Sequence, residues 1–458
     1  MESSTITFKV QRSEPELVAP AKPTPYELKP LSDIDDQEGM RFYSSGIHVY
    51  RNEPSKDGQD PARVIKDALA EALVYYYPLA GRLREEADRK LVVECTGEGV
   101  VFVGADADVS VEDFGADALR PPFPCHEELL CEFQGDGGVT DCPLLYIQVT
   151  RLRCGGFIFG IRINHTIADA PGVMQFLKAL GELARGAAAP SVLPVWERDL
   201  LNARHQPHVT QFHPEYEVAL GGDIDKLWTV PPQDMVLRPF FFGQKEISAL
   251  RKNVPPHLRM SSRFELVTAS VWRSRTAALG YAADDEVRVQ FIVNARGKRQ
   301  VPLPVGFYGN AFAFTVAAAT VDNLCSRPLG YALEMIKKAK ARITDEYMQS
   351  VADYLVLNGR RHFGVARTYI VSDVTRAGFE DVDFGWGEGV YGGPAKGGEG
   401  AILGVANYIT RFKNGKGEEG ILVPVCLPSY AMEKFQLEME GLTQDPIFDP
   451  YGSNSTQF

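Results

Sequence analysis

The stretch HTIADAPG, residues 165–172, places two polar side chains where an apolar segment ends and a helical pattern begins. Before it, residues 144–152 and 156–164 alternate in a way that predicts two antiparallel strands joined by a short turn. After it, apolar residues recur at helical spacing over residues 173–185. Functional groups are often carried at such junctions, so His165 and Asp169 are the first candidates for a site.

A histidine and an aspartate four residues apart suit general-base chemistry. An imidazole with a pKa near neutrality can accept a proton from an alcohol or a thiol, and a carboxylate can orient the ring or hold the nearby backbone. The same spacing also arises by chance, with the aspartate as a helix cap and the histidine as a core residue. The spacing alone leaves both interpretations open.

Three other chemistries lack their sequence signatures. HExxH is absent, and His126 with its two glutamates has no second histidine at the right spacing, so no metal site is predicted. GxSxG is absent too, which favours direct transfer over an acyl-serine intermediate. The GxGxxG match at residues 387–392 leads into Gly393-Pro394 rather than a helix, so it does not predict a dinucleotide site.

The rest of the chain mixes helical and strand-like patterns without a fixed-period repeat. Apolar spacing, with Ser261 or Ser262 as a cap, predicts a long helix over residues 263–279. Between residues 186 and 213 the composition shifts to Ala, Pro and His without periodicity, as in a connection between two halves. Further helices are predicted over residues 61–75, 329–347 and 429–440, and strands over 236–242, 287–294 and both sides of a turn at 414–417. The fold class is therefore α/β with mixed sheets.

Composition narrows the class of protein. The chain has 458 residues, enough for about two or three domains, and its 45% hydrophobic and 24% charged residues are ordinary for a folded protein. With 48 basic against 60 acidic residues, the net charge of -12 disfavours non-specific binding to nucleic acid or to an anionic membrane. An anionic ligand then needs a local site.

Cysteine usage and the first residues favour a cytoplasmic protein. The 7 cysteines include no CxxC pair, so neither a disulfide framework nor a zinc ribbon is expected. The start lacks the apolar run of a secretory signal, and no long uncharged apolar stretch follows. We expect reduced thiols and no membrane-spanning segment.

Five ordered motifs extend over nearly the whole chain. They are LSDID at 31–35, YYPLAGRL at 76–83, HTIAD at 165–169, VNARGK at 293–298 and DFGWG at 383–387. Together they resemble the plant BAHD acyl-CoA-dependent acyltransferases, whose HxxxD and DFGWG patterns are matched without departure.

The resemblance implies two domains that are each similar to chloramphenicol acetyltransferase, with an active-site channel between them. We expect an N-terminal domain at 1–190 with HxxxD, a crossover loop at 191–220, and a C-terminal domain at 221–458 with DFGWG. It also implies a monomer with no permanently bound cofactor and no metal, in which acyl-CoA is a co-substrate.

Roles for individual residues follow from the same resemblance. His165 is expected to take the proton from an acceptor hydroxyl as it attacks the thioester. Asp169 is expected to be structural and paired with Arg296. Trp386 is the suggested donor to the developing oxyanion, and its neighbours in DFGWG are expected to be structural: Asp383, Gly385 and Gly387.

Coenzyme A is an anion, so the acidic chain must offer it local donors. Ser261 and Ser262 at a helix start, and Ser372 before DFGWG, are the candidates. The nearby Arg251 and Lys252 fit solvated surface charge better.

Three segments of the second half together resemble the alcohol acyltransferases, including benzyl alcohol O-benzoyltransferases. These segments are GFYGNAF at 306–312, the run at 372–387 and VYGGPAKGG at 390–398. The resemblance implies transfer of a benzoyl, acetyl or hydroxycinnamoyl group from coenzyme A to a small alcohol. Two alternatives stay open: a hydroxycinnamoyl transferase for monolignols or shikimate- and quinate-type acceptors, and a non-catalytic acyl-CoA-binding protein, which should have lost His165.

Overall fold

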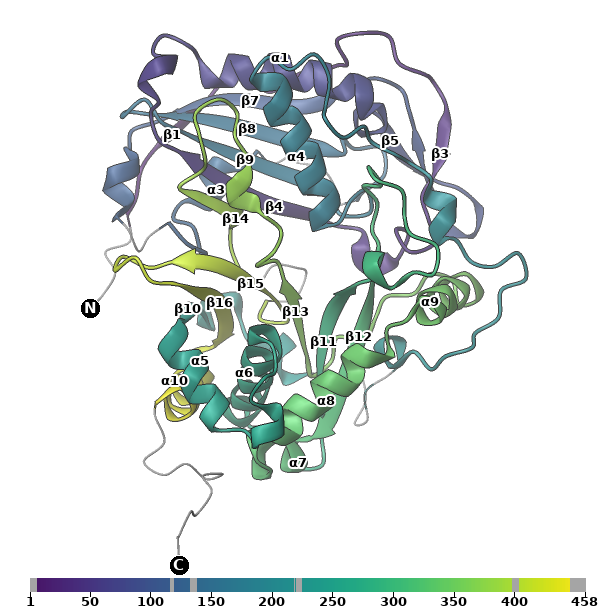
Figure 1. The fold of residues 1–458 in the computed structure, drawn as a ribbon, viewed down its shortest axis with the longest axis vertical. Helices are drawn as coiled ribbons and strands as arrows, with labels where there is room; N and C mark the ends of the chain where they lie inside the picture. Colours follow the sequence, from purple (N-terminus) through teal and green to yellow (C-terminus); the bar gives the residue numbers. More distant parts are fainter. Residues whose placement is uncertain are drawn as a thin grey trace, which may run out of the picture.

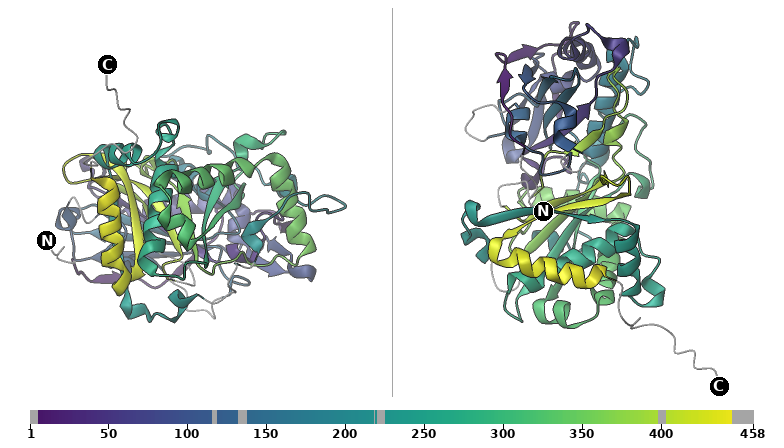
Figure 2. Two further views of the ribbon diagram at one scale, coloured as in Figure 1. Left: turned by 90° about the horizontal axis from the view of Figure 1, so that it is seen from below. Right: turned by 90° about the vertical axis from the view of Figure 1, so that its left-hand side faces the viewer.

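Two large sheets organise the molecule. The structure is a computed structural model that describes residues 6–115, 119–131, 138–217, 219, 225–397 and 403–444. One sheet has 7 strands and the other has 6, and a further sheet of 3 strands lies beside the first. The two large sheets form the upper and lower parts of the molecule in Figure 1, and the side view in Figure 2 shows them as two stacked bodies.

The first sheet has the strand order β1-β7-β8-β9-β4-β14, with β2 also paired to β7. The predicted hairpin forms its centre, where Ile147 of β8 lies opposite Ile161 of β9. Because β7 and β8 run parallel while the other pairs are antiparallel, the sheet is mixed. Its strands are β1 (Val10–Arg12), β2 (Glu16–Val18), β4 (Tyr43–Tyr50), β7 (Val100–Ala107), β8 (Leu145–Leu152), β9 (Phe157–Asn164) and β14 (Tyr391–Pro394); the small sheet holds β3 (Leu28–Pro30), β5 (Arg82–Glu85) and β6 (Leu91–Glu94).

Two amphipathic helices, α1 (Pro61–Tyr75) and α4 (Ala170–Ala184), cover a face of the first sheet and pack against each other (Figure 1). α1 has the predicted bounds because its proline suits the first turn and Asp60 accepts a hydrogen bond from the N–H of Ala62. Their apolar faces bury Leu69 and Leu180 in one core with β8 and β9.

The second sheet has the strand order β10-β16-β15-β13-β11-β12. It is also mixed, since β13 runs parallel to both β11 and β15. Its strands are β10 (Met235–Phe242), β11 (Glu286–Asn294), β12 (Phe312–Thr320), β13 (Thr368–Asp373), β15 (Ala406–Lys413) and β16 (Glu419–Pro428). The helices of this half are α5 (Gln244–Lys252), α6 (Arg263–Leu279), α7 (Val321–Ser326), α8 (Leu329–Arg342), α9 (Asp345–Leu357) and α10 (Ser429–Thr443); α3 (His126–Leu129) belongs to the first half.

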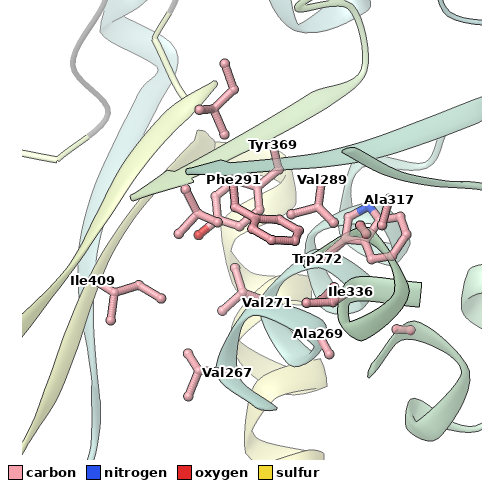
Figure 3. Packing of buried hydrophobic residues seen from close by; sticks show 14 of the residues in the cluster. Val267, Ala269, Val271, Trp272, Val289, Phe291, Ala317, Ile336, Tyr369 and Ile409 are labelled. Atoms are coloured by element: carbon pink, nitrogen blue, oxygen red, sulfur yellow. The ribbon is translucent and has the colours of Figure 1, made fainter. Parts of the chain in front are cut away.

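Helix α6 is the central helix of the second half. It packs against α5, α8 and α10, and it is buried nearly all round. In Figure 3, Trp272 and Val271 of α6 lie among Val289 and Phe291 of the sheet and Ile336 of α8. This core fixes the second sheet, whose strand ends carry residues of the site.

The helix predicted over residues 329–347 is two helices. α8 ends at Arg342, and α9 begins after Thr344, which has extended backbone and whose hydroxyl accepts a hydrogen bond from the N–H of Tyr347. A threonine that caps a new helix turns the chain where apolar periodicity alone predicted continuity.

Residues around DFGWG depart from the simple division into domains. β14 lies within the expected C-terminal domain at 221–458, yet it pairs antiparallel with β4 of the first sheet (Figure 1). Phe384 and Trp386 are buried in the core of the first half. The strand covers what would otherwise be the free edge of β4, which is the physical reason for the exchange.

The segment between the halves packs against both of them. Val195 pairs with Phe307 in a short bridge, and further on Arg204 binds Asp353 of α9 at 2.6 Å. The described part of this segment therefore has fixed contacts with the second half. None of the described helices is long and apolar enough to cross a membrane.

Candidate active site

A cavity of about 240 Å³ lies where the two sheets meet. Its walls come from β4, β9 and β14 of the first sheet and from β11, β12, β13 and β15 of the second. Residues from both halves face it, and among them are Ile163, His165, Phe312, Ser372, Arg376 and Tyr408. The cavity places His165 between the two halves.

His165 follows directly on the last residue of β9. Its N–H donates to the carbonyl of Phe42 at 2.8 Å, which holds the turn against the strand beside it. The imidazole lies between Phe42 and Phe312, with ring centroids at 5.1 Å and 6.2 Å. A ring held between two aromatic side chains presents only part of its edge to the cavity.

Burial sets the charge of this ring. Desolvation lowers the pKa of His165 below its ordinary value, and the charge of Asp169, the side chain of Asn310 and the charge of Asp35 oppose that shift. The ring is therefore neutral at neutral pH and able to accept a proton. Among the described residues, Nδ1 of His165 and Oδ1 of Asn310 are buried without a hydrogen-bond partner.

Asp169 and Arg296 form the ion pair that the family resemblance implies. The guanidinium binds both carboxylate oxygens, with Nη1 at 2.6 Å from Oδ2 and Nη2 at 2.9 Å from Oδ1. Nη2 also donates to the carbonyl of Gly309 at 2.7 Å. The pair joins the start of α4 to the end of β11, and so links the two halves beside the cavity.

Asp169 has a second structural task. Its oxygens accept from the N–H groups of Gly172 and Ala311, each at 3.1 Å, so it caps α4 and holds the residue just before β12. In the described structure it makes no hydrogen bond to the His165 ring. The aspartate caps a helix, as one interpretation of the HxxxD spacing expected, and the histidine faces a cavity, as the other requires.

Trp386 is not placed to stabilise an oxyanion at His165. Its ring packs edge-on against Phe157, at 5.3 Å, at the opposite end of β9 from His165. Eight residues of strand separate these positions, or about 26 Å at ~3.3 Å per residue. Trp386 is not among the residues that line the cavity, so this geometry does not support the suggested donor role.

The DFGWG segment forms a tight turn against the far end of α4. Oδ1 of Asp383 accepts from the N–H groups of Gly385 and Gly387 at 2.7 Å and 2.9 Å. Both glycines have positive φ, 106° and 80°, which other residues rarely adopt. Arg185 donates to the carbonyl of Asp383. These contacts give the segment a structural role.

The three candidate serines do not lie at one site. Ser372 lines the cavity, while Ser261 and Ser262 are not among its lining residues. Ser262 caps α6 by accepting from the N–H of Glu265 at 3.2 Å, and Ser261 accepts from Lys337 at 3.3 Å. Of these three serines, Ser372 is the one that can donate within the cavity.

A second histidine–carboxylate–serine arrangement has no substrate access. Nδ1 of His213 lies 3.2 Å from Glu215 and Nε2 lies 2.8 Å from the hydroxyl of Ser350. All three side chains are buried, and none lines the cavity. The arrangement ties the segment between the halves to α9. Among the described residues, no cluster of His, Cys, Asp and Glu could hold a metal ion.

Sequence reasoning missed the groups behind the His165 turn. Asp35, Arg198 and Asn310 hydrogen-bond to one another and to the backbone of that turn. Asp35 and Asn310 lie in motifs that were quoted for the resemblance, LSDID and GFYGNAF, but no role was assigned to them. Arg198 lies in a segment without periodicity and carries no local signal.

Comparison with known proteins identifies the class. The sequence model of the Transferase family matches residues 8–442. The chain therefore belongs to this family, the BAHD acyltransferases, and its two mixed-sheet halves are the two chloramphenicol acetyltransferase-like domains of that fold. It is an acyl-CoA-dependent O-acyltransferase that acts on small alcohols.

Particular relatives are close in sequence. A benzyl alcohol O-benzoyltransferase of Petunia hybrida is 61% identical over 441 residues, which cover 96% of this chain and 95% of the relative. The Nicotiana tabacum protein of the same name is 60% identical with the same coverage. Alcohol acyl transferase 1 allele GSa of Malus domestica is 53% identical over 444 residues, again 96% of this chain and 95% of the relative.

Solved structures share the fold at lower identity. Vinorine synthase superimposes with a TM-score of 0.72 at 23% identity, covering 95% of this chain and 99% of that one. F. sporotrichioides TRI101, solved with coenzyme A and T-2, gives a TM-score of 0.69 at 17% identity and covers 90% and 98% of the two chains.

Proposed function

We propose that this enzyme transfers a benzoyl group from benzoyl-CoA to benzyl alcohol or a similar small alcohol, with His165 as the general base. The observation that carries the proposal is a neutral histidine that faces a cavity between two halves, in a chain 61% identical to a benzyl alcohol O-benzoyltransferase. The family relationship supports the reaction class, and the cavity supports the size and polarity of the substrates.

The chemistry needs one base and no covalent intermediate. Nε2 of His165 accepts the proton of the alcohol hydroxyl while that oxygen attacks the thioester carbonyl carbon. The C–S bond of the tetrahedral intermediate then breaks, and the proton passes from His165 to the leaving thiolate, which gives the ester and coenzyme A. Because the donor and the acceptor meet directly, both must be bound before either product leaves.

The walls of the cavity favour an apolar, aromatic substrate. They include Ile163, Ile292, Phe312 and Phe379, apolar side chains that offer an alcohol no charged partner. A pocket of this kind binds a ring through burial of apolar surface and gives few polar contacts. At about 240 Å³ the cavity is small for a ligand site, which supports small alcohols over large glycosides.

One cationic side chain at the cavity, that of Arg376, supports a second class of acceptor. Arg376 lines the cavity and is exposed at its rim. A guanidinium there could bind the carboxylate of a shikimate- or quinate-type acceptor, whereas benzyl alcohol would leave it in water. A hydroxycinnamoyl transferase for acidic acceptors is therefore the second candidate, and it rests on this one residue.

Thiol release tests these assignments. Purified enzyme is given acetyl-, benzoyl-, p-coumaroyl-, feruloyl- or malonyl-CoA, each with benzyl alcohol, coniferyl alcohol, hexanol or shikimate. We expect acceptor-dependent thiol release to be fastest with benzoyl-CoA and benzyl alcohol and to be lost in His165→Ala. Initial rates with both substrates varied should give intersecting lines, because transfer is direct.

Other outcomes of this assay are informative. A preference for p-coumaroyl-CoA with shikimate, abolished by Arg376→Ala, would replace the benzoyl assignment with the second candidate. No release with any pair, from folded protein that still binds acyl-CoA, would mean a non-catalytic acyl-CoA-binding protein.

A further inference from the structure

A buried ion pair lies behind the turn that carries His165. Asp35 comes from the LSDID segment and is fully buried, and its Oδ2 lies 2.7 Å from Nη1 of Arg198 in the segment between the halves. Ser32 donates to the same oxygen from its N–H at 3.1 Å and from its hydroxyl at 2.7 Å. Neither member of the pair lines the cavity, so neither touches a substrate there.

The pair reaches the backbone of the His165 turn by two routes. Nη2 of Arg198 donates to the carbonyl of Ile167 at 2.8 Å. Oδ1 of Asp35 accepts from the backbone and side-chain amides of Asn310 at 2.9 Å and 2.8 Å, and that side-chain amide also donates to the carbonyl of His165 at 2.9 Å. The carbonyls of His165 and Ile167, on either side of Thr166, therefore both accept hydrogen bonds from this network.

These carbonyls depend on the network for their partners. Residues 165–169 form neither a helix nor a strand, and buried backbone groups must be paired. The planar guanidinium of Arg198 can hold a carboxylate and a carbonyl in fixed directions at once. In the part of the chain that the structure describes, no helix or strand hydrogen bond replaces these two contacts.

Arg198 itself is held in place from several sides. Its guanidinium stacks on Trp196 at 4.3 Å and on Tyr308 at 5.0 Å, and a Cβ on Gly309 would lie only 2.5 Å from Nη1. The preceding residue, Glu197, has a φ of 24°, in the region that favours glycine. Strain of this kind persists where the surroundings fix the conformation, and it is concentrated near functional sites.

We propose that Asp35 and Arg198 are positioning residues, which set where the His165 ring lies in the cavity by holding the carbonyls of its turn. The inference rests on the proposed role of His165 as the base. A shift of about 1 Å in a reacting group can lower the rate roughly 10²-fold. Since the pair touches no substrate, the loss should fall on kcat and leave KM nearly unchanged.

Arg198→Lys tests the proposal in the full-length enzyme. The lysine keeps a positive charge beside Asp35, but a single ammonium lacks the planar fork that also holds Ile167. We expect kcat to fall about 10- to 100-fold with KM for both substrates within about twofold. Arg204→Lys is the matched control, because Arg204 lies in the same segment and binds Asp353 at 2.6 Å without touching the turn; its kcat should stay at the wild-type value.

A second measurement does not depend on turnover. The imidazole proton signal of His165 is assigned by its absence in His165→Ala and is then followed by NMR through a pH titration. The charged groups around the ring belong to two ion pairs, Asp169 with Arg296 and Asp35 with Arg198. We expect Asp35→Asn to lower the pKa of His165 and Arg198→Met to raise it, because the first removes a negative charge and the second leaves that charge uncompensated.

The outcomes separate this inference from the proposed function. Unchanged kcat in Arg198→Lys, or an equal loss in Arg204→Lys, overturns it. Failure of both Arg198→Lys and Asp35→Asn to unfold cooperatively also overturns it, since the pair would then hold the whole fold rather than one turn. If the wild-type enzyme releases no thiol with any substrate pair, the proposed function fails; if it releases thiol and Arg198→Lys keeps the wild-type kcat, only this inference fails.

Discussion

His165 combines two properties that a base in this cavity needs. Burial keeps the ring neutral, and two aromatic side chains restrict its orientation. The charge of Asp169 opposes the effect of burial on the pKa without a hydrogen bond to the ring. Burial therefore sets the charge of the base, and its aromatic neighbours restrict how the ring is turned.

The lowered pKa of His165 predicts the pH dependence of the reaction. Because desolvation places the pKa of His165 below 6.5, the neutral base predominates from neutral pH upward. We expect kcat/KM to be flat above about pH 7 and to fall tenfold per pH unit once the pH drops below that pKa. Initial rates between pH 5 and 8.5 measure it, and an acid limb centred above pH 7 would contradict a desolvated base.

Trp386 provides a test at the same scale. Loss of an oxyanion donor lowers kcat about 10²–10³-fold, whereas loss of packing lowers only stability. Since Trp386 fills the first core away from the cavity, we expect Trp386→Phe to keep kcat within about threefold and to lower the free energy of unfolding by about 1–2 kcal/mol. Steady-state kinetics and urea unfolding check both parts, and a hundredfold loss of kcat in stable protein would restore the donor role.

At the scale of elements, the site depends on where α4 and β11 begin and end. α4 starts at the HxxxD turn, and DFGWG closes over its other end, so one helix connects the two most recognisable motifs. Arg296 follows β11 and ties the second sheet to that helix. The motifs therefore mark the two ends of a structural element, and only one of them touches the cavity.

The Arg296–Asp169 pair should stabilise this junction. Arg296→Ala leaves the largely buried carboxylate of Asp169 with only backbone donors. Because the Arg296 side chain is 23% exposed, we expect the free energy of unfolding to fall by an amount near the lower end of the usual range, about 3 kcal/mol. Activity should fall with it, because the His165 turn is released. Arg299→Ala is the control, since the contact of Arg299 with Asp345 is longer, at 3.7 Å. Urea unfolding and kcat are measured for each variant. Equal losses in the two variants would contradict a specific role for the Arg296–Asp169 pair.

At the scale of the whole molecule, the two halves are joined by exchanged segments as well as by the cavity. β14 completes the first sheet from the second half of the chain, and His48 of β4 is buried behind it between Phe159 and Phe379. Burial lowers the pKa of His48 to about 4. Acid should therefore weaken the molecule where the two halves interlock.

This gives a prediction for stability against pH. His48 binds a proton at a lower pH in the folded protein than in the unfolded chain, so its contribution is present above about pH 6.5 and is lost as the pH falls toward about 4. The loss amounts to about 3 kcal/mol, and it should be missing in His48→Gln. Unfolding free energies of both proteins at pH 7 and pH 4 measure it; a difference that does not change with pH would contradict the buried neutral state.

Local patterns in the sequence determined much of this protein. Periodicity and capping predicted the hairpin before HTIAD, the bounds of α1 and α6, and the positions of His165 and Asp169 at a strand-to-helix junction. These features were readable because the interactions behind them join residues only a few positions apart. The break between α8 and α9 was missed, since one threonine cap outweighs a continued apolar pattern.

Tertiary structure alone decided which distant groups meet. Asp35 and Arg198 are 163 positions apart, and β14 pairs with a strand more than half the chain away, so no local pattern indicates either contact. Trp386 likewise belongs to the DFGWG motif of the family, but it lies in the core of the first half, far from His165. The physical reason is that a site between two sheets is set by how the sheets pack and exchange strands, and that depends on the buried surfaces of the whole molecule.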